Sequence, residues 1–230
     1  MVTSQKTIVV SLGGSLVVPS TVDTLFLSKL KVLVEKKISQ GFRFLFIVGG
    51  GKICRIYQEA LAEIRPETTV EDLDWLGIYT TQFNAQLVRL VFKDAADQNI
   101  AGDPYDVGSI TAPIIIAAGA RPGSSTDLGA IRAAEKLGAH HVINLSNISH
   151  VYDMDPRENP QAQKFETLSW QQYRSFIPTE WTPGLSTPFD PIAAKKAEEL
   201  GITVAIMSGD LENFERYLDG QEFVGTVISS

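Results

Sequence analysis

The sequence repeats one local pattern three times: a helix-forming segment ends at a glycine, and a β-branched apolar segment follows. The glycines are Gly41, Gly138 and Gly201. Glycine just past a helix end adopts the left-handed conformation at low cost, and short Val- and Ile-rich runs are typical of strands covered on both faces. This alternation predicts an α/β fold: a three-layer αβα sandwich around an open, mainly parallel central sheet.

Hydrophobic periodicity and turn residues give the expected element bounds. Strands are expected at 7–12, 42–48, 114–118, 141–145, 203–207 and 223–228. Helices are expected at 21–39, 52–64, 69–99 with a bend or break, 128–138, 167–176, 190–201 and 210–218. The Pro-rich stretch 178–191 is the only weak boundary, so we expect a single domain over residues 1–230.

Composition limits the class of function. The chain has 44% hydrophobic and 20% charged residues, which is typical of a globular protein. Its net charge of −7 argues against nucleic acid or an anionic membrane as a partner. One cysteine, Cys54, excludes an intrachain disulfide. The first twenty residues lack a basic segment followed by an apolar core, and no apolar run has membrane length, so a cytoplasmic location is expected.

Three glycine-rich turns follow three of the expected strands. They are Gly13-Gly14-Ser15, Gly49-Gly50-Gly51-Lys52 and the stretch 119–127. Because parallel strands end at one edge of the sheet, the turns should lie together. Glycine lets backbone amides approach phosphate oxygens, and helix N-termini favour anions. The turns therefore predict a phosphate-binding edge, although neither a Walker A loop nor a dinucleotide fingerprint is present.

Charged residues flank this edge. Lys52 and Arg55 are three residues apart at a helix start, so they share a face and can reach one anion. Asp127 and Asp190 both lie at expected helix starts, where each side chain could serve only as a helix N-cap. Each could also orient a donor or a Mg²⁺-bound water, and the residues alone leave both readings open.

Taken together, the motifs resemble the amino-acid kinase superfamily. They come in its order: the two glycine loops, Ser125-Thr126-Asp127, the segment 147–156, and Asp190-Pro191-Ile192-Ala193-Ala194. Within it the chain looks like the UMP kinases of bacteria and archaea, closer to the archaeal form. Asp74-x-x-Gly77-x-x-x-Thr81-x-x-Asn84 is similar to their helix that holds the nucleoside monophosphate. The resemblance covers essentially all 230 residues.

The resemblance implies ATP-dependent phosphoryl transfer to UMP, giving UDP and ADP, with Mg²⁺. It implies small-molecule nucleotides as partners and a homo-oligomer, a hexamer built from dimers. The implied catalytic residues are Gly13, Gly14, Ser15, Asp127 and Asp190. The implied UMP-binding residues are Gly50, Gly51, Arg55, Asp74, Gly77, Thr81, Asn84 and Thr126. The implied ATP-binding residues are Gly13, Gly14, Lys52, Asn147, Tyr152 and Asp155.

Two positions depart from the family pattern. Ser11 replaces a lysine that many members carry before the first glycine pair, so positive charge must come from Lys52, Arg121, Lys195 or a metal ion. Ser149-His150 replaces an Asp-Gly pair, and we expect His150 to be a surface loop residue. These departures leave a non-catalytic nucleotide- or oxyanion-binding relative as one alternative.

The other alternative is a superfamily kinase for a carboxylate, carbamate or isoprenoid phosphate, which the Asp74–Asn84 helix argues against. For assembly, the segment 21–39 carries more apolar residues than one buried stripe uses. They are Leu25, Phe26, Leu27, Leu30, Val32, Leu33 and Val34.

Overall fold

The computed structural model describes residues 6–102, 104–180, 185 and 187–230. A seven-stranded sheet crosses the molecule in the order β3-β2-β1-β4-β8-β9-β7. The strand bounds in that order are Ile114–Ala117, Phe42–Val48, Lys6–Leu12, His141–Ser146, Thr203–Ser208, Thr226–Ser229 and Thr167–Ser169. The first five strands are mutually parallel, β9 runs antiparallel to β8, and β7 is parallel to β9. The prediction of a mainly parallel sheet is confirmed.

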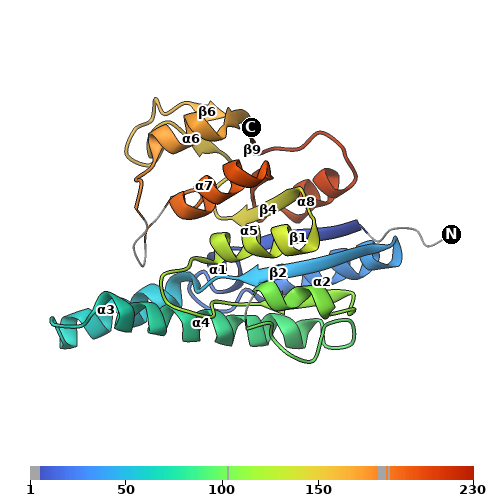
Figure 1. Cartoon of the computed structure of the whole chain (residues 1–230), viewed down its shortest axis with the longest axis horizontal. Helices are drawn as coiled ribbons and strands as arrows, with labels where there is room; N and C mark the ends of the chain where they lie inside the picture. The colour runs from blue at the N-terminus through green and yellow to red at the C-terminus, as the bar shows by residue number, and fades with distance from the viewer. Residues whose placement is uncertain (1–5, 103, 181–184, 186) are drawn as a thin grey trace.

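Helices cover both faces of this sheet (Figure 1). One layer holds α1 (Gly14–Val17), α2 (Thr24–Ser39), α4 (Val70–Val91) and α8 (Leu211–Leu218). The other holds α5 (Thr126–Leu137), α6 (Trp170–Phe176), α7 (Pro191–Leu200) and the 3₁₀ turn η1 (Pro104–Ser109). Side chains alternate between the layers, so Val9 joins the α5 side and Val10 the α2 side. The predicted three-layer αβα sandwich is confirmed.

One helix protrudes from this body. Helix α3 (Gly51–Ile64) lies along α4 and extends to one side of the sandwich (Figure 1). None of the described residues of α3 is fully buried. Its sequence still favours a helix, because its apolar and polar residues alternate with helical periodicity. The helix begins directly after Gly50, its N-cap residue.

Local sequence signals fix the helix ends. Asp23 caps α2 by accepting a hydrogen bond from the amide of Phe26 at 2.8 Å. Thr69 and Asp72 form a reciprocal capping box at the start of α4. At the other ends, Gly138 and Gly201 take left-handed φ angles of 64° and 62°, as the sequence predicts.

Several predicted element bounds are wrong. Residues 167–169 are not helical, because they pair with β9 and Ser169 caps the helix that follows. The last strand begins at Thr226 and not at Phe223, and α4 ends at Val91. A two-stranded hairpin, β5 (Val151–Tyr152) with β6 (Lys164–Phe165), is an addition that the hydrophobic pattern does not predict.

None of the helices in the described part of the chain combines the length and the apolar character needed to cross a bilayer.

Candidate active site

The glycine loops after β1 and β2 touch each other at the carboxyl edge of the sheet. The amide of Gly49 donates to the carbonyl of Leu12 at 2.9 Å, which joins the two strand ends. A Cβ on Gly14 would lie 2.1 Å from the nitrogen of Gly51 and 2.4 Å from the oxygen of Gly49. A side chain at position 14 would therefore push the loops apart. Glycine here allows two amide-rich loops to share one edge, as predicted.

Asp127 lies at the centre of this edge and accepts three hydrogen bonds. Its Oδ1 accepts from the hydroxyl of Ser11 at 2.8 Å and from Nδ2 of Asn144 at 3.2 Å. Its Oδ2 accepts from the backbone amide of Asp190 at 3.1 Å. Burial raises the pKa of Asp127 to about 6, the Ser11 hydrogen bond opposes this, and the charge of Asp190 adds to it.

Asp127 does not cap its helix. The hydroxyl of Ser125 accepts from the amide of Leu128 at 3.1 Å and is the cap of α5. The capping interpretation is therefore wrong for Asp127, whose side chain ties β1, β4 and the start of α7 to α5.

Asp190 does cap α7 and has capacity left over. Its Oδ1 accepts from the amide of Ala193 at 2.6 Å, and the residue is 4% exposed. Its Oδ2 is buried without a hydrogen-bond partner among the described residues. Burial raises the pKa of Asp190, and the amide of Ala193 and the nearby hydroxyl of Ser125 lower it.

The predicted residues of α4 join the second glycine loop to the β3–α5 loop. Nδ2 of Asn84 donates to the carbonyls of Gly49 and Gly50, each at 3.0 Å. The hydroxyl of Thr81 accepts from the amide of Gly119 at 2.9 Å. Oδ2 of Asp74 accepts from the amide of Gly123 at 2.6 Å. Burial raises the pKa of Asp74, and the hydrogen bond from Gly123 opposes the rise. These contacts hold three separate segments together at the glycine edge.

Gly77 allows α3 and α4 to approach each other closely. A Cβ there would lie 3.2 Å from Nε2 of Gln58, whose amide donates to the carbonyl of Leu73 at 2.8 Å. Cys54 is half-buried beside Gly50 and Gly77, and burial raises the pKa of its thiol. A thiol with a raised pKa is a poor nucleophile, so Cys54 is poorly suited to nucleophilic catalysis.

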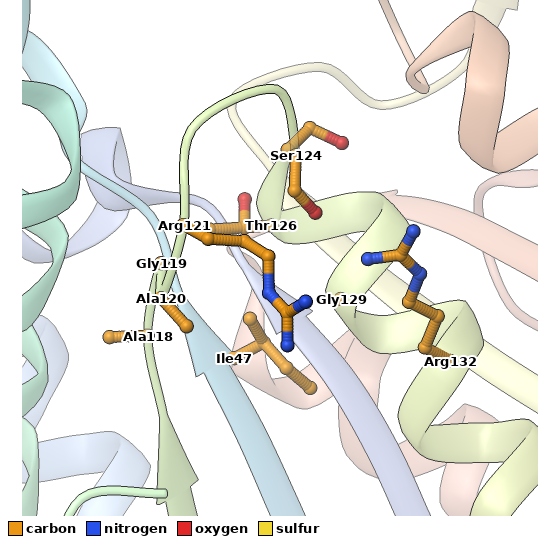
Figure 2. Close-up of a pocket in the computed structure, with 10 residues that line it drawn as sticks. Ile47, Ala118, Gly119, Ala120, Arg121, Ser124, Thr126, Gly129 and Arg132 are labelled. Carbon is orange, nitrogen blue, oxygen red and sulfur yellow. The ribbon is translucent and has the colours of Figure 1, made fainter. Parts of the chain in front are cut away.

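Four cationic side chains lie near the β2–α3 and β3–α5 loops, and a fifth lies on α7. Lys52 and Arg55 are exposed on the first turns of α3, directly after the glycines. Figure 2 shows Arg121 and Arg132 directed toward each other across a small cavity of about 20 Å³ beneath the β3–α5 loop. Thr126, at the first turn of α5, lines the same cavity. Lys195 is exposed on α7.

A larger cavity of about 610 Å³ opens beyond β4. Asn147, Tyr152 and Asp155 all line it, so the structure brings three of the six predicted ATP-binding residues together, whereas Gly13, Gly14 and Lys52 are not in its lining. Nη2 of Arg157 contacts Oδ2 of Asp155 at 2.6 Å, and this pairing lowers the pKa of Asp155 to about 2.

His150 lines this cavity and is only 5% exposed, so the expectation of a surface histidine is wrong. Its ring meets Tyr152 edge-on with a centroid distance of 6.4 Å. Burial and the charge of Lys164 lower its pKa, which favours the neutral ring.

Asn144 is a site residue that the sequence analysis missed. It is 5% exposed and lies beside Ser11 in the register of β1 and β4. The available signal was a single amide side chain inside the apolar run 142–145, because a polar group on a buried strand needs a partner.

Comparisons with known proteins show to which family the chain belongs. The sequence matches the amino acid kinase family over residues 6–208. A uridylate kinase from Pyrococcus abyssi is 33% identical over 203 residues, which are 87% of this chain and 89% of that protein. A uridylate kinase from Methanospirillum hungatei is 32% identical over 227 residues, 97% of this chain and 94% of that protein.

Among solved structures, the uridylate kinase from Archaeoglobus fulgidus superimposes with a TM-score of 0.82 at 29% identity. The match covers 97% of this chain and 100% of that one. The family match spans most of the sequence and includes both glycine loops and every strand of the central sheet except β9. The chain belongs to the amino acid kinase family.

Proposed function

We propose that the chain transfers the terminal phosphoryl group of ATP to UMP and releases UDP and ADP. The observation that carries this proposal is the contact between the Gly14 and Gly51 loops, which gives two phosphate-bearing substrates adjacent sites on one edge. The names of the similar archaeal proteins support UMP as the acceptor.

On the acceptor side, we assign the UMP phosphate to the amides of Gly50 and Gly51, the guanidinium of Arg55 and the hydroxyl of Thr126. Asp74 would face the ribose and uracil, and Gly77 would act on that side of the site by letting α3 and α4 approach each other closely. Thr81 and Asn84 act through the loops that they hold, since each is hydrogen-bonded to a loop backbone group. Charge-assisted contacts of the Arg55 kind are stronger than neutral ones.

On the donor side, the cavity beyond β4 would hold the adenosine of ATP against Asn147, Tyr152 and Asp155. Its volume of about 610 Å³ lies within the usual range of small-molecule sites. Gly13, Gly14 and Ser15, with Lys52, would hold the phosphates. The first glycine loop therefore lies between the two substrates.

The reaction needs little acid–base chemistry, because the attacking oxygen of UMP is already anionic. That oxygen forms a bond to the γ-phosphorus of ATP while the bond to the β–γ bridging oxygen breaks, and ADP leaves with that electron pair. The protein must hold two polyanions in line and offset their repulsion. Asp127 contributes by fixing the Asp190 amide and the start of α7.

The donor set also fits a magnesium ion. Mg²⁺ is usually held by one or two carboxylates together with substrate phosphates and water. Within the described ranges no group of three or more metal-binding side chains occurs, so the protein alone forms no cage. The buried, donor-free Oδ2 of Asp190 is a suitable oxygen ligand, and Asp190 would hold the ion. When bound, Mg²⁺ offsets the negative charge of the ATP phosphates.

We also propose that the chain forms a homo-oligomer, as the hexamer prediction states. Helices α3 and α4 expose large apolar side chains, including Ile64 at 82%, Tyr79 at 63% and Phe83 at 79%. Helix α2 offers fewer exposed apolar side chains than its sequence suggests, because only Leu25 and Val32 of its seven predicted apolar residues are exposed. Single exposed apolar residues are ordinary, but a set along two adjacent helices is typical of an interface.

Light scattering at micromolar concentration tests the assembly. The intact chain should have several times the mass of one chain, and Phe83→Asp should reduce it. A monomeric wild-type protein would contradict the proposal.

A single domain agrees with one seven-stranded sheet that runs from β3 to β7 and takes strands from both halves of the chain, and we retain that proposal for residues 1–230. We retain the cytoplasm as its location, since both proposed substrates are nucleotides of that compartment.

A panel of acceptors tests the function. ADP release from ATP should depend on UMP and be weaker with CMP, carboxylate, carbamate and isoprenoid phosphate acceptors. Efficient turnover of any of those with UMP untouched would contradict the proposal. Tight nucleotide binding without any turnover would indicate a non-catalytic relative.

A further inference from the structure

An aromatic side chain with no role so far borders the large cavity. Phe176 is the last residue of α6, lines the cavity, and is 43% exposed. Phe165 of β6 stacks on its ring, with a centroid distance of 5.4 Å and an interplanar angle of 14°. The Phe176 ring is therefore supported from one side by Phe165 while it borders an open cavity.

The helix that carries Phe176 is firmly anchored. The hydroxyl of Tyr173 donates to the carbonyl of Phe189 at 2.6 Å and accepts from its amide at 2.7 Å. Nε1 of Trp170 donates to the carbonyl of Ile202 at 3.0 Å. Both rings are buried, so α6 has little freedom to shift.

The strand that carries Phe165 is anchored as well. The hydroxyl of the buried Thr226 donates to the carbonyl of Phe165 and accepts from the amide of Val151 at 2.9 Å. Val151 is also the cross-strand partner of Phe165. The stacked pair is thus held in place before any ligand binds, which lowers the entropy cost of binding.

We infer that Phe176 is the stacking platform for the base of the nucleoside triphosphate donor. A supported ring beside a cavity of about 610 Å³, with the polar side chains Asn147 and Asp155 on the same lining, matches a ligand with a flat ring and a polar sugar. This inference rests on the proposed kinase function and adds the residue that recognises the base.

Stacking has a chemical signature that the test can use. It contributes about 1–3 kcal/mol per base, or about 5- to 150-fold in affinity, and it acts on the base alone. Removing the ring should therefore weaken the binding of ATP and leave the binding of a phosphate-only ligand unchanged. A merely structural role for Phe176 would weaken both ligands, because the cavity wall and the first glycine loop would shift together.

The experiment measures binding by isothermal titration with a non-hydrolysable ATP analogue and with inorganic tripolyphosphate. Phe176→Ala should raise the Kd of the analogue by about 5- to 150-fold without changing the Kd of tripolyphosphate. Phe176→Trp should restore analogue binding, since the larger ring still stacks. Val224→Ala removes an exposed apolar side chain outside the cavity lining and should bind both ligands normally.

Unchanged analogue binding in Phe176→Ala, or an equal loss for analogue and tripolyphosphate, would overturn the inference. The outcome is separable from the proposed function. Normal UMP turnover with unchanged analogue binding in Phe176→Ala refutes only the platform, whereas a wild-type chain that binds the analogue but never phosphorylates UMP refutes only the kinase assignment.

Discussion

The hydroxyl of Ser11 donates a hydrogen bond of 2.8 Å to Oδ1 of Asp127, from 116 positions earlier in the chain. Ser11 occupies the position where many superfamily members carry a lysine, so a neutral donor here orients the carboxylate without neutralising it. The raised pKa of Asp127 follows from its burial, which the Ser11 hydrogen bond only partly offsets. The cations of the proposed site lie instead on α3 and the β3–α5 loop.

Exchanging each central aspartate for asparagine separates charge from shape. Asp190→Asn should leave the melting temperature nearly unchanged, because asparagine caps a helix about as well as aspartate. It should lower kcat by about 10²- to 10³-fold if the charge acts on the phosphates. Wild-type turnover in this variant would reduce Asp190 to a helix cap.

Asp127→Asn should lower kcat by a similar factor and also destabilise the fold. The carboxylate accepts three hydrogen bonds, and the NH₂ of asparagine cannot accept from the Asp190 amide. Leaving one buried donor unpaired costs about 1–3 kcal/mol. Chemical denaturation and steady-state kinetics together check both effects, and an equally stable, fully active variant would contradict the account.

Removing the Arg55 side chain should act on the acceptor alone. Arg55→Ala should raise the KM for UMP by about 10- to 150-fold, as expected for a charge-assisted contact of about 1.5–3 kcal/mol. The KM for ATP should hardly change. Arg65→Ala is the matched control, because Arg65 follows the end of α3 and pairs with the exposed Glu67. Equal weakening of both substrates by Arg55→Ala would indicate a structural role.

A single added methyl group should disrupt the contact between the glycine loops. Gly14→Ala would place a Cβ 2.1 Å from the Gly51 nitrogen, so the backbone must move. Displacements of about 1 Å in reacting groups can cost 10²-fold in rate, and we expect at least that loss in kcat/KM. Gly102→Ala is the control, since no described atom lies within 4 Å of its added Cβ. Normal kinetics in Gly14→Ala would contradict the two-loop site.

The contact between α2 and α8 should give a pH-dependent part of the stability. The side chain of Lys37 is 1% exposed, and its Nζ lies 2.6 Å from Asp219 and 3.2 Å from Glu215. Hydrogen bonds from Lys36 and then Lys37 lower the pKa of Glu215 against the effect of burial. The hydrogen bonds to Asp219 and Glu215 raise the pKa of Lys37, although burial alone would lower it.

Lys37→Met keeps a buried apolar chain of similar length and should lower the free energy of unfolding by about 1 kcal/mol at pH 7. Lys37→Ala removes that chain as well and should lower it by about 2–4 kcal/mol. Because the pKa of Glu215 is depressed, its contribution is present above about pH 4.3, the ordinary glutamate value, and is lost as the pH falls through its folded pKa. Urea titrations should therefore show the gap between wild type and Lys37→Met narrowing in acid. A gap that widens there would contradict the ion-pair account.

The alternation of helix, glycine and strand was enough to predict the layers and the glycine edge, because these features are local and periodic. The antiparallel direction of β9 could not be predicted, since it depends on pairing with β8 and with the more distant β7. The β5–β6 hairpin has only two residues in each strand, too few for an alternating pattern to be visible in the sequence. Thr167–Ser169 shows the limit clearly. Its residues suit a helix start, and pairing with β9 makes them a strand.

The site shows the same division. Gly14, Gly51 and Asp190 follow from turn and cap chemistry, which acts within a few residues. The partners of Asp127 do not, because Ser11 and Asn144 reach it from two other strands. The burial of His150 also depends on tertiary packing, so its loop composition gave the wrong expectation.

The most direct measurement of the central claim is phosphorus NMR of the products. Wild-type protein with ATP, Mg²⁺ and UMP should convert UMP to UDP, with one ADP formed for each UDP. Omission of either nucleotide should leave the other unchanged. ADP and inorganic phosphate without UDP, or unaltered UMP beside a phosphorylated carboxylate or another nucleotide, would contradict the assignment.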